Sequence, residues 1–598
     1  MAQKQTKLEL TWIGKENRPK LEPRILIGDA GRSYHAASRV SENDLFDNRL
    51  IFGDNLLALR ALEQEFTGRI KCIFIDPPYN TGSAFAEYDD GVEHSLWLSL
   101  MRDRLELLRR LMTPDGSLWT SLDDSEAHYF KVLCDEVFGR ECFIADICWK
   151  KRDGAPNDRK IGTTYDHILV YGRQRTGTSK KTDAEESFNL MERTEKADSQ
   201  YQSYEEPFGC DPRGPFRKVD STGNAKGGRY VESLFYPVTN PFTGQQVFPR
   251  KGRCWVYHKD EMERMIADRR FFWGKDGKAT TPMRKLFKSE AKPGMTAPTI
   301  WDDVGLNQHA ARELELIFGE KAFFETPKPE GLLKRVVQIA SNPGDIVLDS
   351  FAGSGTTGAV AHKMGRRWIM VELGEHCHTH IIPRLKKVID GEDKGGITDA
   401  VGWKGGGGFR YYRLGASLIV EDEWGNPVIN PEFNAAMLAE AMCKIEGFTF
   451  EPNTDIYWQH GRSTEADFIY VTTQTLTRQM LTKLSDEVGP NRSLLICCSA
   501  FRCDVDGFEN LTVKKIPKAV LKKCEWGHDD YSLEIKNLPA PPAAPPEEAA
   551  LFESGLSSDN AERTGRGNTR KPTRKFGKGK NDGPALFDMG TTGAKGGR

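Results

Sequence analysis

Residues 71–82 read KCIFIDPPYNTG, an apolar run of strand length that ends at an aspartate, two prolines and a tyrosine. Proline cannot continue a sheet ladder, because it has no N–H and its φ is fixed. Asp76 and Tyr79 are therefore presented on a stiff turn at the carboxyl end of a strand, where open α/β sheets place their active sites. A proline-rich strand exit without function has the same local pattern, so the rest of the chain must distinguish the two interpretations.

Strands and helices alternate around this stretch. Residues 49–52 predict a strand, and the leucines of residues 56–66 recur at helical spacing behind Asp54 or Asn55 as the N-cap. With residues 71–76 they form a strand–helix–strand unit, for which a right-handed crossover is expected. The same alternation returns late in the chain, so we expect a largely parallel sheet covered by helices on both faces.

A glycine-rich loop, residues 350–358, follows a second apolar strand that ends at Asp349. The loop contains GxGxxG, and the next strand ends at Glu372, 19 positions after the first glycine, Gly353. This spacing fits a dinucleotide fingerprint, so a nicotinamide or flavin enzyme is one interpretation. Against it, Asp349 would repel a pyrophosphate, and a dehydrogenase has no use for a second acidic strand end at Asp76.

A cofactor with a cationic amino group, an adenosine and no phosphate suits these residues better, and S-adenosylmethionine is such a cofactor. Asp349 would meet its ammonium group, the glycines would allow close backbone approach, and Glu372 would hold the ribose hydroxyls. The strands that end at Asp349, Glu372, Asp54 and Asp76 would then be the first to fourth of one sheet. The last two come first in the chain, so the sequence predicts a circularly permuted Rossmann-like sheet.

The same residues resemble a known family. DPPY early in the chain and FxGxG late in the chain, with an insertion between them, are similar to β-class DNA adenine-N6 methyltransferases, and most similar to the Mod (modification) subunits of Type III restriction–modification systems. The resemblance covers roughly residues 45 to 415. Its supporting stretches are residues 53–56 (GDNL), 76–82 (DPPYNTG), 121–126 (SLDDSE), 326–329 (TPKP), 351–357 (FAGSGTT) and 406–412 (GGGFRYY).

The resemblance implies a role for each motif residue. Asp76 and the carbonyl of Pro77 would accept the two N6 hydrogens of a flipped adenine, Pro78 would complete the turn, and Tyr79 would stack on the base. Aspartate rather than serine before the two prolines suggests adenine N6 instead of cytosine N4. No metal is required, and the spacing of HCHTH at residues 376–380 matches no standard metal site. The expected cofactor-binding residues are Asp54, Phe323, Lys328, Asp349, Phe351, Gly353, Ser354, Gly355, Thr356 and Glu372.

The alternation fails between residues 173 and 290. Lys and Arg outnumber Asp and Glu two to one between Gly209 and Lys292, and aromatic residues are interleaved with these bases. A solvated, irregular insertion is the plainer interpretation. Phosphate contact combined with base stacking needs this composition, so we expect a DNA-contacting target-recognition insertion.

Composition limits the remaining function classes. The net charge of −2 gives no overall attraction to nucleic acid, and no apolar stretch is long enough to span a bilayer. The N-terminus lacks the apolar segment of a secretory signal, and the 12 cysteines form no C-x-x-C pair, so we expect a cytoplasmic protein without a membrane partner.

The expected function is sequence-specific methylation of adenine N6 in double-stranded DNA, as part of a restriction–modification or related phage-defence system. A homodimer and a restriction or helicase subunit are the expected partners. The alternatives are an RNA adenine methyltransferase and a DNA-recognition subunit of a larger defence complex. The expected organisation is a lead-in (1–48), the DPPY half (49–172), the insertion (173–290), the cofactor-loop half (291–415), a small C-terminal α/β domain (416–536) and a disordered Pro-rich, then basic tail (537–598).

Overall fold

The computed structural model describes residues 9–79, 90–157, 160–174, 188–224, 231–319, 324, 326–516, 518, 520–527, 529 and 531. All of them belong to one unit of the chain, Met1–Glu534. The predicted tail, residues 537–598, lies outside the described residues.

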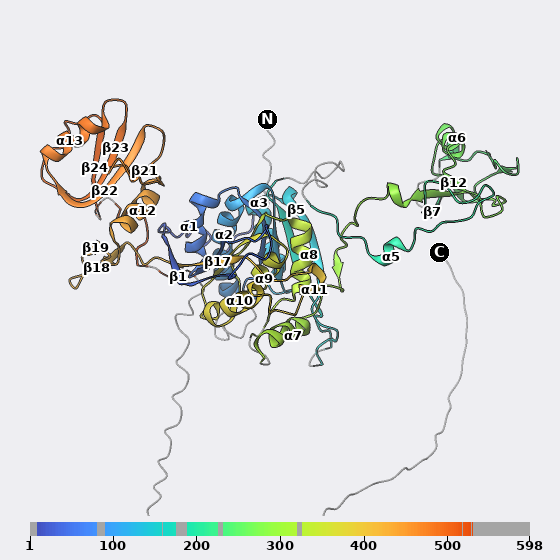
Figure 1. The fold of residues 1–598 in the computed structure, drawn as a ribbon, viewed down its shortest axis with the longest axis horizontal. Helices are drawn as coiled ribbons and strands as arrows, with labels where there is room; N and C mark the ends of the chain where they lie inside the picture. Colours follow the sequence, from blue (N-terminus) through green and yellow to red (C-terminus); the bar gives the residue numbers. More distant parts are fainter. Residues whose placement is uncertain are drawn as a thin grey trace, which may run out of the picture. The chain divides into compact units, whose positions relative to one another are not determined.

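A ten-stranded sheet forms the centre of this unit (Figure 1), in the order β1-β17-β2-β16-β15-β3-β4-β6-β5-β14. Six of its nine strand pairs are parallel, as expected; β1 with β17, β4 with β6, and β6 with β5 are antiparallel. The strands are β1 (Leu26–His35), β17 (Gly408–Leu414), β2 (Asn48–Phe52), β16 (Arg367–Glu372), β15 (Ile346–Asp349), β3 (Ile70–Ile75), β4 (Met112–Leu122), β6 (Tyr165–Gly172), β5 (Phe143–Lys150) and β14 (Ile300–Trp301).

The four strands that carry the acidic ends are adjacent. β2, β16, β15 and β3 lie side by side in parallel, so the four strands are neighbours in one sheet, as predicted. The permuted Rossmann-like sheet is therefore confirmed. The two strands from the second half of the chain, β15 and β16, are inserted between two strands from the first half.

The N-terminal stretch needs a correction. It was expected to be an irregular lead-in, but Leu26–His35 forms β1, which pairs with β17 at the edge of the sheet. Most of its side chains are half-buried or exposed, so the strand needs no run of apolar residues, and its pattern gave no period-2 signal.

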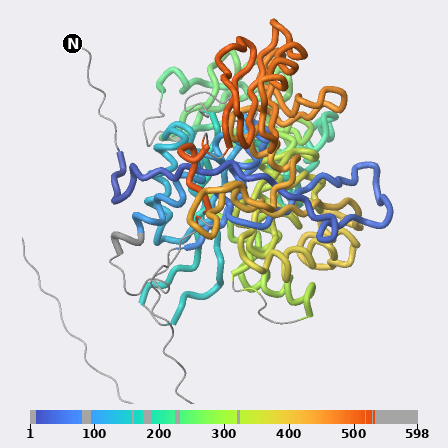
Figure 2. The backbone as a smooth tube through the Cα atoms, turned by 90° about the vertical axis from the view of Figure 1, so that its left-hand side faces the viewer, coloured from blue at the N-terminus to red at the C-terminus, as the bar shows by residue number. Residues whose placement is uncertain are grey.

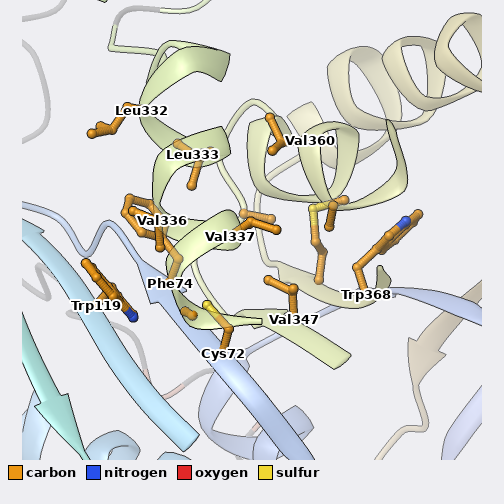
Figure 3. Packing of buried hydrophobic residues seen from close by; sticks show 14 of the residues in the cluster. Cys72, Phe74, Trp119, Leu332, Leu333, Val336, Val337, Val347, Val360 and Trp368 are labelled. Atoms are coloured by element: carbon orange, nitrogen blue, oxygen red, sulfur yellow. The ribbon is translucent and has the colours of Figure 1, made fainter. Parts of the chain in front are cut away.

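Each face of the sheet carries its own hydrophobic core, because alternate residues of a strand point to opposite faces. Ile73 and Ile75 of β3 pack with α1 (Asn55–Phe66), α2 (Asp90–Leu111) and α3 (Ala127–Phe138). Cys72 and Phe74 pack on the other face with α8, α9 and α10 (Figure 3). The bounds of these helices are α8 (Glu330–Ala340), α9 (Thr356–Lys363) and α10 (Ile382–Ile389), and α7 (Asn307–Phe318) precedes them in the chain.

The insertion has a small hydrophobic core of its own. Trp255, Met262, Phe271 and Trp273 are buried in it between short elements. These are the sheet β12-β13-β7 (Phe271–Phe272, Met283–Phe287, Phe216–Asp220), the pairs β8 with β11 (Thr222–Asn224, Arg253–Trp255) and β9 with β10 (Val238–Thr239, Gln246–Val247), and the helices α5 (Glu195–Asp198) and α6 (Lys259–Ala267). Strands of two to five residues are too short for a recognisable period.

The C-terminal residues form a five-stranded sheet in the order β20-β21-β22-β23-β24. β22 pairs with β23 and β23 with β24, both in parallel, and this part of the chain is drawn in orange in Figure 2. The elements are β18 (Ile419–Glu421), β19 (Pro427–Ile429), α12 (Ala435–Glu446), β20 (Thr449–Phe450), β21 (Gly461–Arg462), β22 (Asp467–Leu476), α13 (Arg478–Val488), β23 (Ser493–Phe501) and β24 (Leu511–Lys515). Across the described ranges, every helix is too short or too polar to cross a membrane.

Candidate active site

Two acidic residues lie next to each other at the carboxyl ends of two neighbouring strands of the sheet. β15 ends at Asp349 and β3 ends one residue before Asp76. The two strands pair in parallel, with Cys72 opposite Val347 (both labelled in Figure 3) and Ile73 opposite Leu348. The segments that follow β15 and β3 therefore leave the sheet at the same end of the strands. The proline turn and the glycine loop share one site.

The two oxygens of Asp76 have different environments. Oδ2 accepts a hydrogen bond from Nζ of Lys328 at 2.5 Å, and that lysine is only 8% exposed. Oδ1 is buried and has no hydrogen-bond partner among the described residues. A buried acceptor without a donor is costly, so this oxygen is suited to accept a hydrogen bond from a bound ligand.

The turn after Asp76 is fixed at two points. The Pro78 carbonyl accepts a hydrogen bond from Nε1 of Trp97 at 2.9 Å, and the Tyr79 hydroxyl lies 2.9 Å from Oγ of Ser121. Burial, and next the negative charge of Asp76, raises the pKa of Tyr79 well above its usual value. Tyr79 therefore stays a neutral phenol at physiological pH, as a stacking residue requires.

Asp349 is buried without an opposite charge. Its oxygens accept hydrogen bonds from the Phe351 N–H at 2.9 Å and the Thr357 hydroxyl at 2.5 Å. Within the described part of the chain, it forms no ion pair. Burial raises the pKa of Asp349 to about 7, and the charges of Asp76 and Glu372 add to this effect against the two hydrogen bonds. A cationic group brought to this carboxylate would favour its ionised form.

The loop after Asp349 requires glycine at two positions. Gly353 and Gly355 have φ of 53° and 77°, which disfavour a side chain. A Cβ at Gly355 would also approach the side chain of Ile381 to 3.0 Å. Glu372 holds the loop from the neighbouring strand, because its Oε2 accepts a hydrogen bond from the Gly353 N–H at 2.8 Å.

Ser354 and Thr356 are buried and are bonded from behind the loop. Arg384 of α10 donates to the Ser354 carbonyl at 3.2 Å and to the Thr356 hydroxyl at 2.8 Å. It also donates to Glu330 at 2.9 Å, and Lys363 bonds both oxygens of that carboxylate at 3.0 and 2.8 Å. All these charged side chains are fully buried. No motif or spacing in the sequence predicts this network, which sets the shape of the loop.

The other predicted cofactor residues differ in their surroundings. Asp54 caps α1, since its Oδ1 accepts from the N–H groups of Leu56 and Leu57 at 2.9 and 3.0 Å, and its Oδ2 accepts from Arg104 at 3.2 Å. The structure thus uses both oxygens of Asp54 within the protein. Phe351 is half-buried against the core under α1 and α2. Phe323 lies outside the described residues.

Two residues near the site were missed by sequence reasoning. Phe324 has its ring 3.4 Å from the position of a Cβ at Gly353, so this aromatic side chain covers the glycine loop. Asp166 of β6 is buried and accepts a hydrogen bond from Nζ of Lys151 at 2.6 Å. Burial raises the pKa of Asp166, and the negative charge of Asp76 raises it further, whereas Lys151 lowers it; the pKa is raised overall. Phe324 stands beside the predicted Phe323, whereas nothing in the sequence links residue 166 to residue 76.

Comparison with known proteins places this arrangement in a family. Residues 70–383, more than half of the chain, match the family model described as DNA methylase. The chain belongs to the DNA methylase family. Both strand ends of the site, Asp76 and Asp349, lie within the matched segment.

Several curated proteins are similar to this chain. The "Probable type III restriction-modification enzyme HindVI Mod subunit" of Haemophilus influenzae is 30% identical over 433 residues, which are 64% of this chain and 56% of the relative. The StyLTI Mod subunit of Salmonella typhimurium is 31% identical, over 53% of this chain and 50% of the relative. The Type II methyltransferase M.KpnI of Klebsiella pneumoniae is 28% identical, over 54% and 78%.

The chain spans about half the length of the Mod subunits that it matches. Among solved structures, the PvuII DNA methyltransferase (cytosine-N4-specific) is 14% identical; the match covers 62% of this chain and 95% of that one, with a TM-score of 0.31.

Proposed function

We propose that this DNA methylase transfers a methyl group from S-adenosylmethionine to N6 of an adenine flipped out of double-stranded DNA. It would act as the modification component of a restriction–modification or related defence system. The observation that carries the proposal is that Oδ1 of Asp76, which has no hydrogen-bond partner among the described residues, lies beside the strand end that bears Asp349 and the glycine loop. The Asp76 carboxylate would accept a hydrogen from a substrate amine. The adjacent Asp349 carboxylate has no ion-pair partner among the described residues.

The residues around Asp349 fit S-adenosylmethionine. The cofactor carries an ammonium group, and the buried Asp349 carboxylate has no cationic partner among the described residues. The glycines at 353 and 355 add no side chains of their own to the loop, and the positive φ at both positions favours glycine. Glu372, which already holds the loop, lies at the end of the adjacent strand where ribose hydroxyls bind in related sheets. When bound, the cofactor supplies an electrophilic methyl group on sulfur.

Asp76 would control the amine that attacks this methyl group. Its free Oδ1 accepts one N6 hydrogen, and the Pro77 carbonyl accepts the other, so the nitrogen lone pair is drawn out of conjugation with the ring. Positive charge develops on N6 during transfer, and a fixed carboxylate stabilises that charge. Asp76 therefore acts through position and charge, and the methylated nitrogen, which is then cationic, loses one proton to solvent water after the transfer.

Lys328 and Tyr79 would complete the substrate side. The 2.5 Å contact from Lys328 holds Oδ2, which leaves only Oδ1 for the base and fixes the direction of the carboxylate. The Lys328 ammonium also lies 5.2 Å from the centroid of the Tyr79 ring. Tyr79, anchored by Ser121, provides a flat surface for the flipped base, whose stacking contributes about 1–3 kcal/mol.

The insertion would contact the DNA. Basic residues near aromatic rings are present on its described part, for example Lys218 at 4.2 Å from the centroid of Tyr204 and Arg284 at 5.8 Å from that of Tyr257. Such pairs suit phosphate contact next to base stacking. The similarity to Mod subunits supports a restriction subunit as partner; a homodimer and a cytoplasmic location are proposed with it.

Expression in a host without DNA methylation, followed by long-read mapping of modified adenines, tests the proposal. A short recurring sequence with methylated adenine is expected, and it should disappear with Asp76→Ala. Asp345→Asn, at the opposite end of β15, is the matched control and should leave the marks unchanged. Unmarked DNA together with labelled methyl groups on RNA would support the RNA methyltransferase instead. Transfer to neither nucleic acid, with retained DNA binding, would support the recognition subunit.

A further inference from the structure

The insertion contains a pocket of about 280 Å³ that has no assigned role. Aromatic side chains form much of its wall, because the buried rings of Phe271 and Trp273 and the partly exposed ring of Phe242 all line it. Its volume is near the lower end of the range for small-ligand sites. Flat apolar walls of this kind suit a flat aromatic ligand.

The polar lining of the pocket is fixed by a buried ion cluster. Lys285 donates to Glu206 at 2.5 Å and to Asp211 at 2.8 Å, and none of the three side chains is more than 7% exposed. Arg213 holds Asp211 from the other side at 2.9 Å. Glu206, Asp211 and Lys285 all line the pocket, and Arg213 balances the charge of the second carboxylate, so a carboxylate–ammonium pair is held there in a fixed position without a net charge. Such a pair can recognise a ligand edge that carries both a donor and an acceptor.

The rim carries an exposed aromatic ring and an arginine in contact. Phe208 is 72% exposed, an unusual position for a phenylalanine, and its ring lies 5.2 Å from that of Phe242. The guanidinium carbon of Arg269 lies 5.1 Å from the centroid of Phe208. Ring and guanidinium planes are the groups on which nucleic-acid bases stack.

Arg269 also has an unfavourable backbone conformation. Its φ of 53° is the only positive φ of a non-glycine residue in the described ranges. It follows α6 at a position where helices commonly end with glycine in the left-handed conformation. A large side chain kept in a strained conformation at the rim of a pocket indicates a role for that side chain.

We propose that this pocket receives a nucleobase of the bound DNA other than the target adenine. Phe208 and Arg269 provide the stacking surface at the entrance, and Glu206 and Lys285 contact the edge of the base inside. The inference rests on the proposed function, because the DNA is the source of the base. It adds a second base-binding site, on the insertion, to the one formed by Asp76 and Tyr79.

The test uses the full chain and the DNA sequence found by methylation mapping. Phe208→Ala and Arg269→Gly should each weaken DNA binding about tenfold, since loss of stacking has this order of effect. Arg269→Gly relieves the backbone conformation, so its thermal unfolding temperature should stay equal or rise, which separates lost binding from misfolding. The matched controls are Phe235→Ala, another exposed phenylalanine in a ring contact within the insertion, and Arg250→Ala; both lie outside the pocket lining.

Salt dependence and base removal identify the ligand. The slope of log affinity against log salt should be unchanged in Phe208→Ala, whereas loss of a phosphate contact would reduce it by about 0.9. On DNA that lacks one base at a single non-target position, the penalty of Phe208→Ala should disappear. The proposal is overturned if Phe208→Ala binds DNA as tightly as Phe235→Ala does, or if the slope of log affinity against log salt falls in Phe208→Ala. It is also overturned if the penalty of Phe208→Ala disappears only on DNA that lacks the target adenine. If the wild type neither binds nor marks DNA, the proposed function fails first, and the two failures are thereby distinguished.

Discussion

Asp349→Asn should stabilise the free protein and remove most of its cofactor affinity. Asparagine has nearly the same shape, and its oxygen can still accept from the Phe351 N–H while its amide group donates to the Thr357 hydroxyl. The substitution therefore changes the charge at this strand end and keeps both hydrogen bonds. It separates the cost of the buried carboxylate from its use in binding.

The size of the stabilisation follows from the pKa of Asp349, which burial raises from 3.8 to about 7. The folded state keeps its proton up to neutral pH, and the unfolded chain releases it near pH 4. The folded state thus binds more protons in this range, so the free energy of unfolding falls as pH rises from about 4 to 7 and is constant above. A pKa difference of three units corresponds to a loss of on the order of 4 kcal/mol in the free energy of unfolding between pH 4 and pH 7. The asparagine variant has no carboxyl group at this position and does not lose this stability.

Chemical denaturation followed by tryptophan fluorescence measures this difference, and the buried Trp368 lies on the adjacent strand β16. The variant and the wild type should be equally stable near pH 4, and the variant should be the more stable at pH 8. Calorimetry should show S-adenosylmethionine binding at least about tenfold weaker, because a charge-assisted contact is lost. Equal stability at pH 8, or unchanged cofactor affinity, would refute the role given to Asp349.

Four further outcomes are expected. Asp76→Ala should lower kcat for DNA methylation by about 10²–10³-fold with cofactor affinity retained, as measured in single-turnover assays, because it removes a fixed charge beside N6. Tyr79→Ala should lower kcat/KM for DNA by about 5–150-fold, and Tyr79→Phe by much less, because only the alanine variant loses the stacking ring. Lys328→Met should destabilise the protein by about 3–5 kcal/mol in urea titration, since it leaves the Asp76 carboxylate without its partner. Arg384→Lys should weaken cofactor binding in calorimetry and leave kcat at saturation unchanged, because one ammonium cannot bond the loop and Glu330 as the planar guanidinium does.

The sheet was predictable because its functional strands share one pattern. Each is a short apolar run that ends at an acidic residue, and the chemistry of one cofactor requires those ends to be adjacent. That β2, β16, β15 and β3 are neighbours followed from this requirement, although β15 and β16 come hundreds of residues after β2 and β3 in the chain; their order within the sheet did not follow from it. β1 gave no such signal, because an edge strand can keep polar side chains in solvent.

The side-chain contacts of the site were less predictable. The Lys328 contact with Asp76 joins residues 252 positions apart, and it depends on where α8 begins, at Glu330. The bonds from Arg384 to the glycine loop depend on how α10 packs behind it. Residue types and local spacing carry no information on such geometry. The role of Asp54 was left open between helix cap and cofactor contact, and its bonds to the α1 N–H groups show the cap.

The position of β15 and β16 between β2 and β3 has a consequence for synthesis of the protein. Cys72 of β3 pairs with Val347, 275 residues later in the chain. At about 5–20 residues per second, a ribosome needs roughly 15–55 s to make that length. During this interval both edges of β2 and one edge of β3 expose backbone N–H and C=O groups that lack their sheet partners. The strand ends of the candidate site therefore come together only after the second half of the chain has emerged.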